Sequence, residues 1–66
     1  MTLAEAKSIA LKNAGVSSGE ATFTTARKDR DDGVSYYEIE FCSAGVEYEY
    51  EISLSGKIID KEIDRD

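Results

Sequence analysis

The sequence predicts an α+β fold in which one N-terminal helix packs on a four-stranded antiparallel β-meander. Apolar residues first recur at helical spacing, over residues 3–14, and then follow a period of two from residue 21 onward. Turns that contain glycine divide this second part into four segments of strand length. Because 66 residues suffice for only one small core, we expect a single domain over residues 1–66.

The helix is expected at residues 3–14. Thr2 is a favourable N-cap, and Glu5 stands three residues later, which is the spacing of a capping box. The apolar stripe of this helix consists of Leu3, Ala6, Ile9 and Ala10. Gly15 directly after the helix is the residue that most readily adopts the left-handed conformation of a C-terminal cap.

Four strands are expected after a short connector at residues 17–19. They are residues 21–30, 34–42, 46–52 and 57–63. Each of the intervening turns, residues 31–33, 43–45 and 53–56, contains a glycine, which supplies the positive φ of a tight turn. Residues 64–66 are expected to be a frayed end.

The register of the central hairpin can be derived from its alternation. A two-residue loop at Ala44-Gly45 places three apolar pairs on one face, Tyr37 with Ile52, Ile39 with Tyr50 and Phe41 with Tyr48. The same loop places Glu40 opposite Glu49 and Glu38 opposite Glu51 on the other face. This separation of apolar from charged side chains supports the register, and the helix is expected to cover the apolar face.

The strand at residues 21–30 allows two registers. A two-residue loop at Asp32-Gly33 places Ala26 on the apolar face but turns Phe23 outward, whereas a three-residue loop does the reverse. A β-bulge near Thr24-Thr25 would bring both residues to the apolar face.

The last strand contains two adjacent isoleucines that compete for the core. Ile59 is preferred to Ile58, because Ile59 shares its parity with Ile63.

Composition excludes several classes of function. Eight basic and fourteen acidic residues give a net charge of -6, which argues against nucleic-acid binding. The chain has no His and one Cys, so a Ser-His-Asp triad, a Cys-His dyad and a His-based zinc site cannot form within it. No apolar run approaches the roughly 20 residues of a membrane-spanning helix. We expect no enzymatic activity, no catalytic residues, no metal, no cofactor and no membrane insertion by this fragment.

A ladder of carboxylates is the candidate partner surface. It consists of Glu38, Glu40, Glu47, Glu49 and Glu51 on the open face of the central hairpin, with Tyr36 as an exposed aromatic residue beside them. This face can contact a basic partner surface, or it can be a solvated face that Arg27 or Lys28 on the next strand partly neutralises. A general acid/base pair would need a pocket to shift its pKa values, and a flat sheet face offers none.

Several segments together resemble a PepSY domain. The resemblance covers nearly the whole chain and is most specific in Tyr37-Glu38-Ile39-Glu40-Phe41 and in Gly56-Lys57-Ile58. It implies a non-catalytic module, extracellular or in the bacterial cell envelope, that inhibits or regulates a peptidase or a cell-wall lytic enzyme. The alternative is a structural module that packs against a sister domain or associates with itself. Because the domain starts directly after Met1, we expect that the chain is an excised part of a longer protein.

Overall fold

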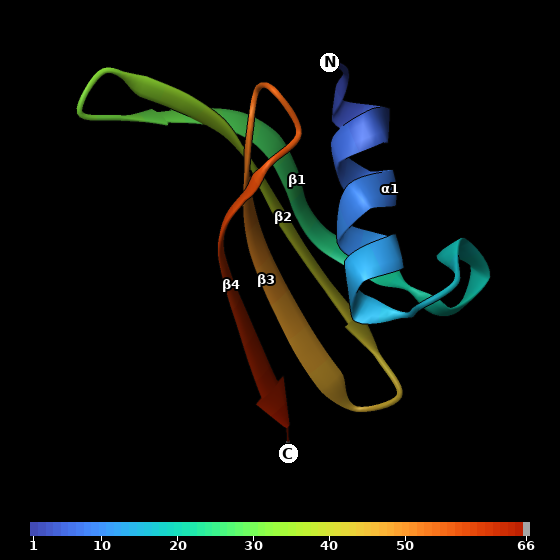
Figure 1. Ribbon diagram of the computed structural model, residues 1–66. Helices are drawn as coiled ribbons and strands as arrows, with labels where there is room; N and C mark the ends of the chain where they lie inside the picture. The colour runs from blue at the N-terminus through green and yellow to red at the C-terminus, as the bar shows by residue number, and fades with distance from the viewer. Residues whose placement is uncertain (66) are drawn as a thin grey trace.

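The computed structural model describes residues 1–65 and consists of one helix on one face of an antiparallel sheet (Figure 1). Its elements are α1 (Leu3–Ala14), a short 3₁₀ turn (Ser18–Glu20), β1 (Thr22–Asp31), β2 (Val34–Ser43), β3 (Val46–Ser53) and β4 (Ile58–Arg65). The four strands are neighbours in sequence order, β1-β2-β3-β4. The predicted fold class is therefore confirmed.

Helix α1 has the predicted bounds, and both caps are present. The backbone N–H of Thr2 donates to Oε1 of Glu5 at 2.7 Å, and the backbone N–H of Glu5 donates to Oγ1 of Thr2 at 3.2 Å. The hydrogen bond from the Thr2 backbone N–H lowers the pKa of the Glu5 carboxyl, because it favours the charged form, and the Thr2 side chain lowers it further. At the other end Gly15 has a φ of 72°, and the N–H of Val16 donates to the carbonyl of Leu11 at 3.0 Å.

The central hairpin has the predicted register. Ala44 and Gly45 form its two-residue turn with φ values of 51° and 79°, as a type I′ turn requires. Ile39 consequently lies opposite Tyr50, and the other two predicted apolar pairs, Tyr37 with Ile52 and Phe41 with Tyr48, are also formed. Glu40 lies opposite Glu49 and Glu38 opposite Glu51, as expected.

The core lies between α1 and the β2–β3 hairpin. Its fully buried members are Ala6, Ala10, Ile39, Phe41, Tyr50 and Ile52, with Leu11 and Tyr37 at its margin. Two tyrosine hydroxyls attach the ends of the helical segment to the sheet. Tyr37 donates to the carbonyl of Met1 at 2.6 Å, and Tyr50 donates to Oδ1 of Asn13 at 2.9 Å. These bonds satisfy the polar ends of the two rings and orient α1 on the sheet.

Strand β1 resolves its two possible registers by a bulge. The pairing shifts between Phe23 and Thr25, so that Phe23 lies opposite Phe41 while Ala26 lies opposite Ile39. The ring centroids of Phe23 and Phe41 are 5.5 Å apart. The predicted bulge is thus confirmed, and it places both apolar residues on the helix side.

Strand β4 corrects two predictions. Ile58, not Ile59, lies opposite Ile52 and packs against the core, and the register shift beside it leaves Ile59 51% exposed. The preference for Ile59 was wrong, because it assumed that side chains alternate without interruption from Ile63 back to Ile59 and beyond. The bulge interrupts this alternation, so that Ile58 faces the core instead. The strand also continues to Arg65, so Asp64 and Arg65 are not frayed; the same expectation for Asp66 lies outside the described residues.

Within residues 1–65, no helix has both the length and the apolar character needed to cross a bilayer.

The buried position of Ile39 gives a stability prediction with a matched control. Ile39→Ala should lower the free energy of unfolding by about 2–4 kcal/mol, because it leaves a cavity in the core. The same substitution at exposed Ile59 should change it by no more than about 0.5 kcal/mol. Urea denaturation of the two variants measures both values. Equal effects at the two positions would contradict the described core.

Candidate functional site

The face of the sheet opposite α1 is strongly acidic. All five predicted glutamates lie on it, because β2 and β3 alternate without interruption. The pairing of the outer strands adds further carboxylates from β1 and β4. We call this surface the acidic face; its carboxylates are Asp29, Asp31, Glu38, Glu40, Glu47, Glu49, Glu51, Asp60, Glu62 and Asp64.

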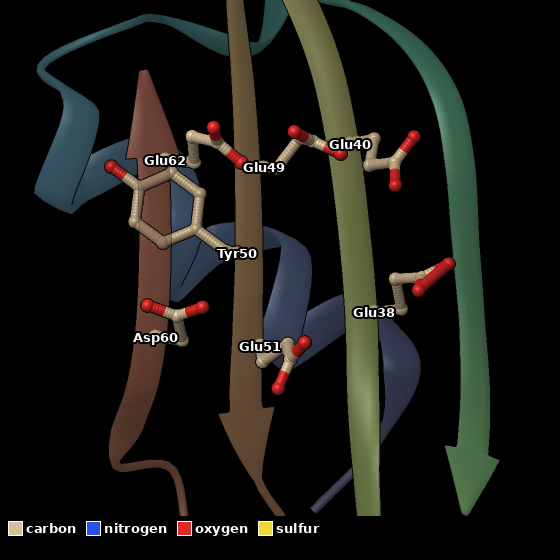
Figure 2. Close-up of a pocket in the computed structure, with 7 residues that line it drawn as sticks. All are labelled: Glu38, Glu40, Glu49, Tyr50, Glu51, Asp60 and Glu62. Atoms are coloured by element: carbon tan, nitrogen blue, oxygen red, sulfur yellow. The ribbon is translucent and has the colours of Figure 1, made fainter.

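The carboxylates of the acidic face form rows that cross the sheet. Glu40, Glu49 and Glu62 are successive cross-strand partners on β2, β3 and β4. A second row consists of Glu38, Glu51 and Asp60, and a third contains Glu47 and Asp64 beside Cys42. Figure 2 shows the first two rows on the side of the sheet away from the helix. Directly opposed like charges destabilise a sheet, so these rows carry an energetic cost.

The basic residues of the sheet are placed differently. Lys28, Arg30, Lys61 and Arg65 lie opposite residues of the helix side. Among the strand residues described within 1–65, Arg27 is the one basic residue that the register places on the acidic face. The two faces of the sheet are therefore opposite in charge character.

Arg27 and Thr25 compensate the rows at the β1 end. Nη2 of Arg27 lies 3.0 Å from Oε1 of Glu38 and 3.5 Å from Oδ2 of Asp29. Oγ1 of Thr25 donates to Oε1 of Glu40 at 3.2 Å. Of the two cations considered from the sequence, Arg27 partly neutralises this face, whereas Lys28 lies opposite Tyr37 on the helix side.

Glu49 occupies the centre of the first row. The charge of Glu40 raises the pKa of the Glu49 carboxyl, and partial removal from water and the nearby Glu62 raise it further. Each of these effects disfavours the ionised form. The repulsion among the carboxylates of this face therefore has its clearest effect on the pKa of Glu49.

Tyr36 lies at one end of the acidic face, between Asp29 on β1 and Ser53 on β3. It is half-buried rather than fully exposed, so the expectation of an exposed ring was only partly right. Partial removal from water raises the pKa of its phenol, and Asp29 and Glu51 raise it further. The neutral phenol can donate a hydrogen bond to a partner.

The acidic face is shallow, and the polar groups at its centre are mainly carboxylates. Its central depression is lined by carboxylates from β2, β3 and β4 together with Tyr50, which also contacts α1 (Figure 2). Within residues 1–65, no three Asp, Glu or Cys side chains are arranged to hold a metal ion. The arrangement can present negative charge and hydrogen-bond acceptors to another molecule.

The carboxylates of β4 were not part of the predicted surface, although the sequence contained a signal for them. Asp60, Glu62 and Asp64 alternate with Lys61, Ile63 and Arg65. Because Ile63 lies opposite Tyr48 on the helix side, the alternation places the three acidic residues on the other face of the sheet. The assignment of Asp29 to this face depends on the two-residue turn at Asp32 and Gly33, and the sequence left the length of that loop open.

Comparison with known proteins gives a family and two relatives. The family model PepSY, described as "Peptidase propeptide and YPEB domain", matches residues 1–62. The "Uncharacterized protein Spy1430" of Streptococcus pyogenes serotype M6 is 45% identical over 58 residues, which cover 86% of this chain and 45% of the relative. The "Uncharacterized protein YkoJ" of Bacillus subtilis is 44% identical over 66 residues, which cover 97% of this chain and 36% of the relative. The chain thus spans less than half the length of these relatives. No solved structure matches it significantly.

The crowding at Glu49 predicts that its neutralisation stabilises the fold. Glu49→Gln should raise the Tm by a few degrees at neutral pH, because it removes repulsion from both Glu40 and Glu62. Glu47→Gln is the matched control on the same strand; it should give a smaller rise, because Glu47 faces Cys42 on one side. Thermal unfolding followed by circular dichroism measures both. A lower Tm for Glu49→Gln would show that this carboxylate is held by a cation instead.

The raised pKa of Glu49 also predicts a pH dependence. The folded chain binds this proton more tightly than the unfolded chain, in which the pKa is near its ordinary value of 4.5. The stability contributed by the protonated form is therefore present below that value and is lost as the pH rises through the folded pKa. The Tm difference between Glu49→Gln and wild type should be small at about pH 4 and largest at about pH 7. A difference that is constant over this range would contradict the assignment.

Proposed function

The chain belongs to the PepSY family, and on that premise we propose that it is a non-catalytic protein-binding module that inhibits or regulates a peptidase. The description of the family as a peptidase propeptide domain supports this proposal. On this proposal the chain acts by contact with another protein rather than by chemistry of its own. We propose further that the protein acts outside the cell or in the cell envelope.

The observation that carries the proposal is the acidic face. A sheet is a stable support for a contact surface, and here the carboxylates of β2 and β3 are backed directly by the buried pairs of the core. The net charge of -6 adds a long-range attraction for a positively charged partner. We propose that the acidic face, with Glu38, Glu40, Glu47, Glu49, Glu51 and Tyr36, contacts a basic surface of the peptidase.

The chemistry of the surface defines the partner. Carboxylates accept hydrogen bonds from Arg and Lys, and Arg can engage one carboxylate with two parallel bonds. The half-buried Tyr36 adds an aromatic ring and a hydroxyl at one end of the face. Because exposed charges are screened over about 8 Å at physiological ionic strength, the association should weaken as salt is added.

An inhibition assay tests the proposal. The chain should inhibit a peptidase of the same genome, and neutralising Glu40→Gln and Glu49→Gln together should weaken that inhibition at least fivefold. Neutralising Glu20→Gln and Asp32→Asn together is the matched control, because it makes the same change in net charge at exposed positions outside the β2–β3 ladder. Equal effects of the two double variants would show that only net charge matters. Absence of inhibition, with self-association or binding to a sister domain instead, would favour a structural role.

A further inference from the structure

The outer edge of β4 is open to another strand. The sheet order β1-β2-β3-β4 leaves β4 at one end, with β3 as its neighbour. From Asp60 to Arg65 the strand keeps an unbroken register with β3 and every residue is exposed. Helix α1 packs on β1, β2 and β3, and Figure 1 shows β4 at the side of the sheet away from it. The backbone groups on the outer side of this edge are therefore available for pairing.

The acidic rows are compensated at one end of the sheet and open at the other. At the β1 end, Arg27 pairs with Glu38 and Thr25 donates to Glu40. At the β4 end the same rows terminate in Asp60 and Glu62. Within residues 1–65 both salt bridges of the sheet involve Arg27, so the β4 end has no equivalent cation.

The two sides of β4 differ in a regular way. Asp60, Glu62 and Asp64 lie on the acidic face, and Lys61, Ile63 and Arg65 lie on the helix side. Ile63 is 40% exposed there, beside Lys61, whose Nζ donates to Oδ1 of Asn13 at 3.1 Å. A neighbouring strand would therefore meet carboxylates on one side and an apolar, cationic strip on the other.

The other edge of the sheet lacks this pattern. Strand β1 is interrupted by its bulge between Phe23 and Thr25, and bulges oppose pairing at an edge. On its acidic-face side, Arg27 stands beside Asp29 and bonds to it. Strand β1 thus already has a cation on the acidic face, which leaves β4 as the edge without one among the described residues.

We propose that the β4 edge binds an extended segment of a partner protein that carries Lys or Arg at every second position. Added as a fifth strand, this segment would align its cations with Asp60, Glu62 and Asp64. Each row of carboxylates would then end in a positive charge at the β4 edge, as the row of Glu38 does at Arg27 on β1. Its alternate residues would lie on the helix side beside Ile63. The inference rests on the proposed function and specifies how the partner is held.

The same pattern disfavours a second copy of this chain that would continue the acidic face at the β4 edge. If two β4 strands paired with their acidic faces on the same side, only carboxylates would meet on that face, because Asp60, Glu62 and Asp64 are the residues that β4 places there. Directly opposed like charges are unfavourable. A strand that continues the acidic face at this edge therefore needs a different sequence, with cations in place of these carboxylates.

Synthetic peptides test the binding mode. The probe is an eight-residue peptide in which Lys alternates with Val and Thr, and its control has the same composition with all Lys residues consecutive. The alternating peptide should bind the ¹⁵N-labelled chain at least fivefold more tightly, and backbone amides of β4, not of β1, should gain protection from hydrogen exchange. Equal affinities without protection in β4, protection in β1, or dimerisation through β4 without peptide would each overturn the proposal.

Two charge reversals within one row separate edge binding from binding flat on the face. Glu62→Lys lies on β4 and should weaken the alternating peptide at least fivefold. Glu40→Lys lies two strands away in the same row, within the proposed peptidase contact but away from the β4 edge, and should weaken the peptide by a smaller factor. Equal losses would mean that the peptide lies across the face. Circular dichroism checks that both variants keep the fold.

The same two variants in the peptidase assay keep this inference separate from the proposed function. If the wild-type chain inhibits the peptidase and Glu62→Lys inhibits equally well, the edge proposal fails and the proposed function stands. If the alternating peptide binds at β4 but the wild-type chain inhibits no peptidase, the proposed function fails and the edge site stands.

Discussion

The register of the β2–β3 hairpin is the constraint on which the rest of the structure depends. The two-residue turn at Ala44 and Gly45 places Ile39 opposite Tyr50 under α1, and in the same step it places Glu40 opposite Glu49 on the far side. Because side chains alternate with a period of two, a slip by one residue would exchange the two faces and put carboxylates beneath the helix. The register of the hairpin therefore determines both which side chains are buried in the core and which carboxylates lie on the acidic face.

This coupling explains why the acidic face is tolerated. Each opposed pair of carboxylates costs a few tenths of a kcal/mol, whereas burying an Ile or aromatic side chain of the adjacent core contributes about 1.5–3 kcal/mol. The balance favours the fold even though the pKa of Glu49 is raised by its neighbours. Arg27 relieves the repulsion at the β1 end, and the proposed partner strand would relieve it at the β4 end.

The sequence predicted those elements in which the local pattern was unambiguous. The capping box and Gly15 defined α1, and unbroken alternation defined the central register. The bulge in β1 was predictable because Phe23 and Ala26 could not otherwise both face the core. The choice between Ile58 and Ile59 was not, since two adjacent isoleucines fit the core equally well and the bulge that decides between them depends on the turn at residues 53–56. The choice between Arg27 and Lys28 was likewise left open, because their faces depend on the β1 register that the turn at Asp32 and Gly33 sets.

The most direct test of this account is a disulfide that only the described register permits. Cys42 lies opposite Glu47 on the acidic face, and opposed residues of an antiparallel pair have Cβ atoms close enough to be bridged. Under mild oxidation, Glu47→Cys should form an intramolecular disulfide with Cys42 in the monomer, and Glu49→Cys, opposite Glu40, should keep both thiols free. Mass spectrometry after thiol alkylation distinguishes the two states. A bridge in Glu49→Cys, or none in Glu47→Cys, would contradict the register and with it the acidic face.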